Sequence, residues 1–194
     1  MSRRCTRTRP SKRNSHTSDG PLRRPVSCHS HGDRTVIDFL YRSLLIGIGA
    51  TAIFDLWGLF LKHVFGLPGA NWGPVGRWFY HLARGTVYHE DIAKARPFAS
   101  ERAVGWIGHY AVGVLFAAVL LALVPVHWRQ EPTLMPALLV GLVTVGAGWF
   151  LLQPGMGAGI AASRRPNANQ IRALNIAGHV VFGLGLYASA LLIR

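Results

Sequence analysis

The residues with the clearest chemical capacity are a few polar side chains that interrupt long apolar stretches. They comprise one carboxylate, two imidazoles and two amides: Asp55, His109, Gln153, Asn175 and His179. An ionised aspartate in a membrane-spanning helix costs about 2.5–3.5 kcal/mol on insertion scales, so such residues usually pair or serve a transport pathway. Histidine exchanges a proton near neutral pH, and a neighbouring carboxylate favours its charged form. The set therefore suggests a site that handles a proton, an ion or a small solute.

Other interpretations of the same residues stay open. His109 and His179 on facing helices would suit the axial ligands of a haem iron, and Asp55 with both histidines would suit a divalent metal. The polar side chains would equally serve as packing contacts in a purely structural or assembly protein. No set of catalytic residues is recognised, which favours a protein that is not an enzyme. Neither haem nor metal is the expected cofactor.

Three further candidates lie in connecting segments rather than in apolar runs. His81 belongs to the first long connection, and Arg164 and Arg165 follow the glycine-rich run at 155–159. Glycines followed by arginines are typical of anion-binding nests. No strand precedes this run, so a dinucleotide-binding turn is excluded and a tight helix exit is the better interpretation.

Four apolar runs of about 20 residues fix the positions of the polar set. We expect membrane spans at about 43–61, 104–124, 134–153 and 174–193. Each run is long enough, at a rise of about 1.5 Å per residue, to cross a hydrocarbon core of about 30 Å. Composition agrees, because 50% of the 194 residues are hydrophobic and only 15% are charged. The predicted fold class is all-α: a four-helix transmembrane bundle formed by residues 35–194.

The alternating direction of these helices brings the polar residues to one depth. Asp55 lies near the end of the first span, whereas His109 and His179 lie near the starts of the second and fourth. Gln153 closes the third span, so all four approach the same membrane face. Small residues recur at spacings of three and four around them, a pattern typical of helix contact faces in bilayers. We therefore expect Asp55, His109 and His179 to point into the bundle and to converge.

The connection between the first two spans, about 62–103, is long enough to contain structure of its own. Pro74 suits the first position of a helix and Gly85 suits a C-terminal cap. Between them the apolar Trp78 and Phe79 oppose Arg77 and other basic residues. This pattern predicts a short amphipathic helix lying in the membrane interface.

Residues 1–34 differ from the rest, with nine Lys and Arg against two acidic residues and few large apolar side chains. This composition predicts a disordered basic tail, and a start codon placed too far upstream also fits it. Cys5 and Cys28 both fall in the tail, so no disulfide is expected in the folded part.

The net charge of +13 comes from this tail and from the loops, where membrane proteins normally place Lys and Arg. Nucleic acid is therefore not an expected partner, whereas a lipid bilayer is. Four short helices make a narrow bundle, which also suggests a homo-oligomer. Orientation depends on the tail. The face with the termini carries more basic residues if the tail is counted, and the face with the long loop carries more if it is not.

Four motifs give the chain a resemblance to a known family. They are Gly49-Ala50-Thr51-Ala52-Ile53-Phe54-Asp55-Leu56-Trp57, Gly105-Trp106-Ile107-Gly108-His109-Tyr110, Gln153-Pro154-Gly155-Met156-Gly157-Ala158-Gly159-Ile160-Ala161-Ala162-Ser163 and His179-Val180-Val181-Phe182-Gly183-Leu184-Gly185-Leu186-Tyr187. From Ile37 onward the sequence resembles a bacterial family of small multipass membrane proteins, domain of unknown function 2938. The resemblance implies a multi-pass protein of the bacterial inner membrane and supplies no catalytic residue.

Overall fold

The computed structural model describes residues 30–194, with side chains from residue 35 onward, and this part of the chain is helical and contains no strand. Four of its helices are long and apolar enough to cross a membrane: Thr35–Phe65, Glu101–Leu123, Leu134–Gly155 and Ala168–Leu192. The predicted all-helical class is therefore confirmed. The predicted basic tail falls mainly on residues 1–29, outside the described residues, and α1 already begins at Ser30.

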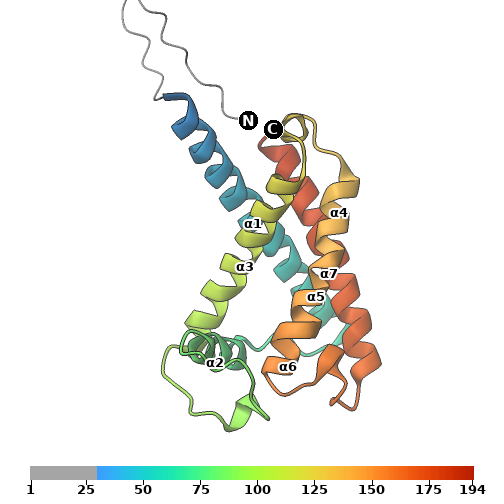
Figure 1. Ribbon diagram of the computed structural model, residues 1–194. Helices are drawn as coiled ribbons and strands as arrows, with labels where there is room; N and C mark the ends of the chain where they lie inside the picture. Colours follow the sequence, from blue (N-terminus) through green and yellow to red (C-terminus); the bar gives the residue numbers. More distant parts are fainter. Residues whose placement is uncertain (1–29) are drawn as a thin grey trace, which may run out of the picture.

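The helices run alternately up and down, so that the start of α1 and the C-terminus lie at one end of the bundle (Figure 1). α1 packs against α3 and α7, and α7 packs against α4, whereas α3 and α4 barely touch. The main elements are α1 (Ser30–Phe65), α2 (Trp72–Leu82), α3 (Glu101–Leu123), α4 (Leu134–Val143), α5 (Val145–Ala147), α6 (Gln153–Gly155) and α7 (Ala168–Leu192). Short 3₁₀ turns at Ile92–Lys94, Val126–Arg129 and Ile160–Ala162 complete the described chain. The helices thus form a row, α3–α1–α7–α4.

The third apolar run is helical throughout but irregular, which its hydropathy does not reveal. Between α5 and α6 the segment Gly148–Leu152 is a π-helix, whose wider turn carries one extra residue. The third span was expected to end at about residue 153, and the helix ends two residues later, at Gly155. The irregularity matters because π turns often occur at functional sites, and this one lies directly before Gln153.

The core lies in the half of the bundle nearer the termini. Ile46, Leu120 and Leu186 are fully buried there. Helix contacts depend on small residues, since a Cβ on Gly47 would collide with the backbone of Val114. Gly58, further along α1, makes no such contact, because a Cβ there would meet nothing within 4 Å.

At the opposite end, α2 packs against the start of α3 (Figure 1). The expected short amphipathic helix is present but begins at Trp72, two residues before Pro74, because the Asn71 side chain accepts a hydrogen bond from the Gly73 N–H and caps it there. The loop that follows α2 docks on the glycine-rich segment. His89 N–H donates to the Gly155 carbonyl at 2.9 Å, and Ile92 N–H donates to that of Met156 at 3.2 Å.

We expect Gly157→Ala to weaken this docking. Gly157 has φ +88°, and a Cβ there would collide with the Glu90 carbonyl. The substitution should lower the free energy of unfolding by about 1–3 kcal/mol, measured by thermal unfolding in detergent. Gly85→Ala is the matched control, because Gly85 shares the positive φ (+86°) but its Cβ would meet nothing. Equal losses in the two variants would show that the loop contact contributes no stability.

Candidate functional site

Asp55 is held by two side chains of the neighbouring helix. His109 Nε2 donates a hydrogen bond to Asp55 Oδ1 at 3.0 Å, and the Tyr110 hydroxyl donates to Oδ2 at 2.9 Å. Both Asp55 and His109 are mostly buried, with 19% and 15% of their side chains exposed. A hydrogen atom on Nε2 leaves Nδ1 as the nitrogen that can accept a further proton. The α1–α3 contact therefore contains a carboxylate, an imidazole and a phenol in hydrogen-bonded sequence.

The His109 ring is surrounded by aromatic side chains. Trp72, the first residue of α2, stacks on it with ring centroids 4.0 Å apart and planes inclined by 30°. Phe54, Tyr110 and Trp106 also contact it, at centroid distances of 5.8, 5.6 and 6.0 Å. The face of an indole attracts a cation, by about 0.5–2 kcal/mol depending on how far the site is desolvated. The His109 ring thus lies against an indole face on one side and hydrogen-bonds a carboxylate at its edge.

His179 belongs to a second polar cluster on the other side of α1. Its Nδ1 lies 3.0 Å from Thr144 Oγ1 and 3.1 Å from the Gly141 carbonyl, which also accepts the Thr144 hydroxyl. The Phe54 ring contacts both histidines, with its centroid 5.8 Å from that of His109 and 6.2 Å from that of His179. Asp55 and His109 thus meet as expected, whereas His179 makes no hydrogen bond with them in the described structure. Of the three residues expected to converge, Asp55 and His109 form a direct contact, and His179 contacts the same Phe54 ring as His109.

Gln153 and Asn175 form a third contact, directly after the π turn. Asn175 Oδ1 accepts hydrogen bonds from Gln153 Nε2 at 2.9 Å and from Trp149 Nε1 at 3.1 Å. Gln153 Oε1 is buried and has no hydrogen-bond partner among the described residues. The polar residues therefore lie in three separate contacts, Asp55–His109, Thr144–His179 and Gln153–Asn175, rather than in one shared site.

The loop candidates lie outside these contacts. His81 lies on α2 with its ring next to that of His89, and Arg164 lines a cavity of about 550 Å³ together with His89 and Glu90. Arg165 is exposed. Within the described residues, no hydrogen bond joins His81, Arg164 or Arg165 to the polar residues of these three contacts.

The geometry allows the haem and metal interpretations to be tested for fit. A haem ligated by His109 and His179 would have to fit beside Phe54, whose ring contacts both imidazoles. Among the described residues, no group of three or more His, Cys, Asp or Glu side chains could hold a metal ion. The arrangement therefore does not fit a metal bound by Asp55, His109 and His179 together.

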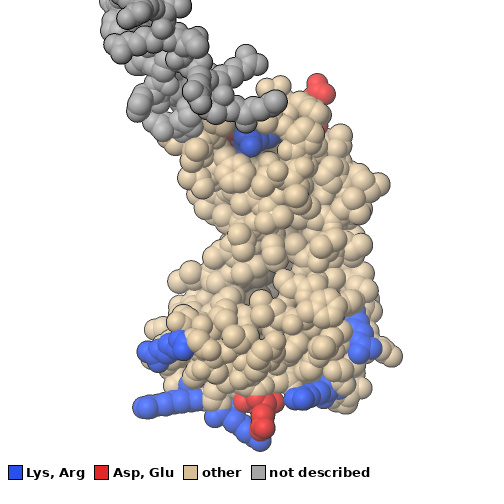
Figure 2. All heavy atoms as spheres, viewed as in Figure 1, with Lys and Arg blue, Asp and Glu red and all other residues tan. Residues whose placement is uncertain are grey.

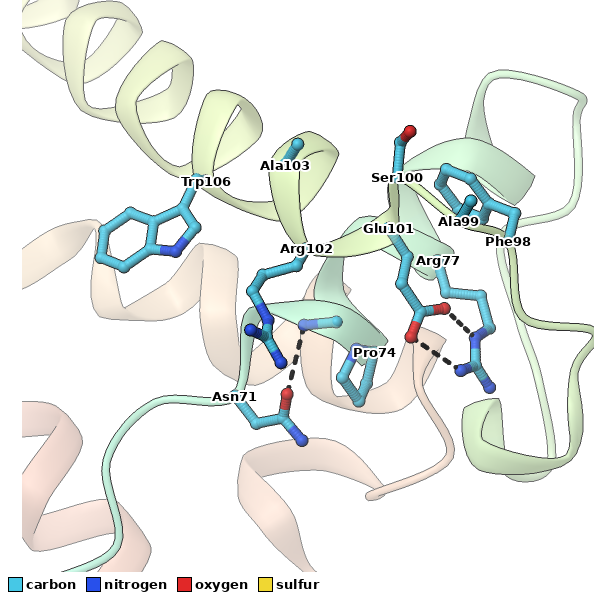
Figure 3. Close-up of a pocket in the computed structure, with 11 residues that line it drawn as sticks. Asn71, Pro74, Arg77, Phe98, Ala99, Ser100, Glu101, Arg102, Ala103 and Trp106 are labelled. Atoms are coloured by element: carbon cyan, nitrogen blue, oxygen red, sulfur yellow. Dashed lines mark hydrogen bonds and ion pairs between the residues drawn. The ribbon is translucent and has the colours of Figure 1, made fainter.

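Sequence reasoning did not identify the contact that holds α2, and with it Trp72, in place. Arg77 is 8% exposed, and its guanidinium donates to both oxygens of Glu101 at 2.9 and 3.1 Å (Figure 3). Its Nη1 also donates to the carbonyls of Ile92, Ala93 and Ala95. A cavity of about 820 Å³ adjoins this pair, lined also by Arg102 and Trp106 (Figure 3). Arg77 was predicted only as part of the polar face of α2.

The fold and the polar contacts together define an all-helical protein with four helices of membrane-spanning length and buried polar pairs between them. The chain belongs to the family described as Protein of unknown function (DUF2938), which matches residues 44–193. This range includes Asp55, His109, Gln153, Asn175 and His179. Comparisons with curated proteins and with solved structures gave no match.

Proposed function

We propose that this chain is an integral protein of the bacterial inner membrane that binds and releases a proton at Asp55, His109 and Tyr110. The observation that carries the proposal is the Asp55 carboxylate, which accepts hydrogen bonds from His109 and Tyr110 within the apolar part of the bundle. Buried ionisable residues in membrane helices usually mark proton or ion pathways.

The outer surface of the bundle supports membrane insertion. On the face seen in Figure 2, Lys, Arg, Asp and Glu lie near the two ends of the molecule and a broad uncharged zone separates them. Large apolar side chains such as Ile107, Val143 and Leu184 are exposed on the long helices. A soluble monomer rarely exposes so much contiguous apolar surface, and a lipid bilayer would cover it.

The proton chemistry follows from the hydrogen bonds. With Nε2–H donated to Asp55, an added proton binds at His109 Nδ1, and the ring becomes an imidazolium in contact with a carboxylate. The Trp72 face and the Asp55 charge both stabilise that cation. Loss of the proton restores the neutral ring without breaking the Asp55 contact. Tyr110 adds a hydroxyl through which a proton can approach the carboxylate.

A fluorescence titration tests this proposal. Because an imidazolium quenches a stacked indole more strongly than neutral imidazole does, emission should fall as the pH is lowered through the range of about 8 to about 5 in which histidine titrates. His109→Gln should remove this change in emission. Trp72→Phe, which removes the stacked indole, should remove it as well. His63→Gln is the control, because His63 is exposed and hydrogen-bonds only to the Leu59 carbonyl of its own helix. An unchanged titration in His109→Gln would refute proton binding at this site.

Membrane insertion is tested separately by single-cysteine labelling. Cys5 and Cys28 are replaced first. A cysteine at Val143, which is 74% exposed, should resist a membrane-impermeant maleimide, while one at Lys94 should react from one side only. The reactive side also gives the orientation. Rapid labelling of the Val143 position in intact membranes would contradict insertion.

A further inference from the structure

Two histidines outside the membrane-spanning helices lie against each other at the loop end. His81 is in the last turn of α2, and His89 follows in the loop that docks on Gly155. Their ring centroids are 4.9 Å apart and their planes are inclined by 67°. The Nε2 atoms of both rings are buried and have no hydrogen-bond partner in the described part of the chain.

The hydrogen bonding of His89 defines which of its nitrogens is free. His89 Nδ1 lies 3.2 Å from the Gly155 carbonyl oxygen. A carbonyl can only accept, so Nδ1 carries the hydrogen atom and Nε2 keeps an unshared electron pair. A buried acceptor without a partner costs about 1–3 kcal/mol. Metal-binding histidines have this same arrangement, with one nitrogen donating to a backbone carbonyl and the other bound to the metal.

From this geometry we infer that the Nε2 atoms of His81 and His89 bind one divalent transition-metal cation, with water completing the coordination. Two neutral imidazoles suit Zn²⁺, Cu²⁺ or Ni²⁺ and not Mg²⁺ or Ca²⁺, which require oxygen ligands. With Zn–N bonds of about 2.0 Å, two imidazole centroids in a tetrahedral site lie about 5 Å apart. The observed separation of 4.9 Å matches that value.

The surroundings give the cation both an entry route and a structural effect. His89 lines the cavity of about 550 Å³ that also contains Glu90 and Arg164. No third His, Cys, Asp or Glu joins the two histidines in a metal-binding group within the described residues, so the protein supplies two ligands. A bound cation links α2 to the loop, and through the His89–Gly155 bonds it links both to the glycine-rich segment. This site is independent of the proton-binding proposal.

The experiment is a titration of the full chain in detergent with Zn²⁺ alone, followed by calorimetry and by thermal unfolding. The protein is purified without a polyhistidine tag, and Cys5, Cys28, His16, His29 and His31 are replaced so that the N-terminal segment cannot bind the metal. We expect one equivalent of Zn²⁺ to bind and to raise the melting temperature, since a ligand that binds only the folded state stabilises it. Mg²⁺ should produce neither effect.

His81→Gln and His89→Gln should each weaken Zn²⁺ binding by about tenfold or more and remove the rise in melting temperature. His63→Gln, which alters an exposed histidine, should leave both unchanged. Because the histidine variants could disturb the loop, their melting temperatures without metal are compared with that of the unaltered protein, and equal values show that the fold is kept. Absence of Zn²⁺ binding in the protein that keeps both His81 and His89 would overturn the inference. Full binding in the double variant would overturn it too.

Discussion

Asp55→Asn is expected to abolish the protein's function while leaving its folding almost intact. Asparagine has nearly the shape of aspartate, and its oxygen still accepts a hydrogen bond from His109 or Tyr110. It carries no charge, however, and cannot stabilise an imidazolium at 3.0 Å. Interhelical hydrogen bonds in bilayers contribute about 0.6 kcal/mol on average, so a lost one does not unfold the protein. The variant should therefore insert and accumulate normally.

The measurement is membrane abundance together with complementation of the phenotype of a deletion strain. In the same variant, the tryptophan emission should lose its response between about pH 8 and about pH 5. Asp55→Glu is the companion variant, because it restores the carboxylate one methylene further out and should recover part of both signals. Full complementation by Asp55→Asn at normal abundance would mean that Asp55 serves only as a packing contact.

Gly141→Leu is expected to have the largest effect on stability. A Cβ at Gly141 would collide with the backbone of Gly183 and with the His179 carbonyl, so a leucine must push α4 away from α7. Overpacking costs about 1–3 kcal/mol even where side chains can adjust, and here the obstacle is backbone. The variant should melt at a clearly lower temperature and lose its sharp size-exclusion peak in detergent.

Gly148→Leu is the matched control for this prediction. It makes the same substitution in the same apolar run, but a Cβ at Gly148 would meet nothing within 4 Å. It should melt close to the unaltered protein. Equal melting temperatures for Gly141→Leu and the unaltered protein would contradict the close α4–α7 contact.

The hydropathy of the sequence and the distance of each polar residue from the end of its span were sufficient to predict the long helices and the Asp55–His109 contact. The lengths of the four apolar runs fixed the long helices, because about 20 apolar residues match the thickness of a bilayer. Counting residues from the span ends placed Asp55 and His109 at the same level, and they do form a hydrogen bond. Depth does not determine how a helix is rotated about its axis, however. The contacts of Phe54 with both His109 and His179 could therefore not be predicted.

The remaining differences have similar causes. A π turn leaves the hydropathy of a segment unchanged, so Gly148–Leu152 could not be distinguished from a regular helix. Trp72 lies 37 positions before His109 in the sequence, and its stacking depends on the way Arg77 holds α2 against Glu101. Tyr110 is the residue that could most readily have been added to the predicted polar site. It directly follows His109 and, like it, carries a polar hydrogen that can be donated to Asp55.

The central claim, that His109 takes up a proton beside Asp55, is tested most directly by the ¹⁵N signals of the His109 ring. Protein labelled at its histidines is reconstituted in bilayers and studied by solid-state NMR, with His109→Gln identifying the resonances. Our account predicts that, between about pH 8 and about pH 5, the His109 Nδ1 signal moves from the position of an unprotonated nitrogen to that of a protonated one, while Nε2 remains protonated. His109 signals that stay constant throughout this range would contradict it.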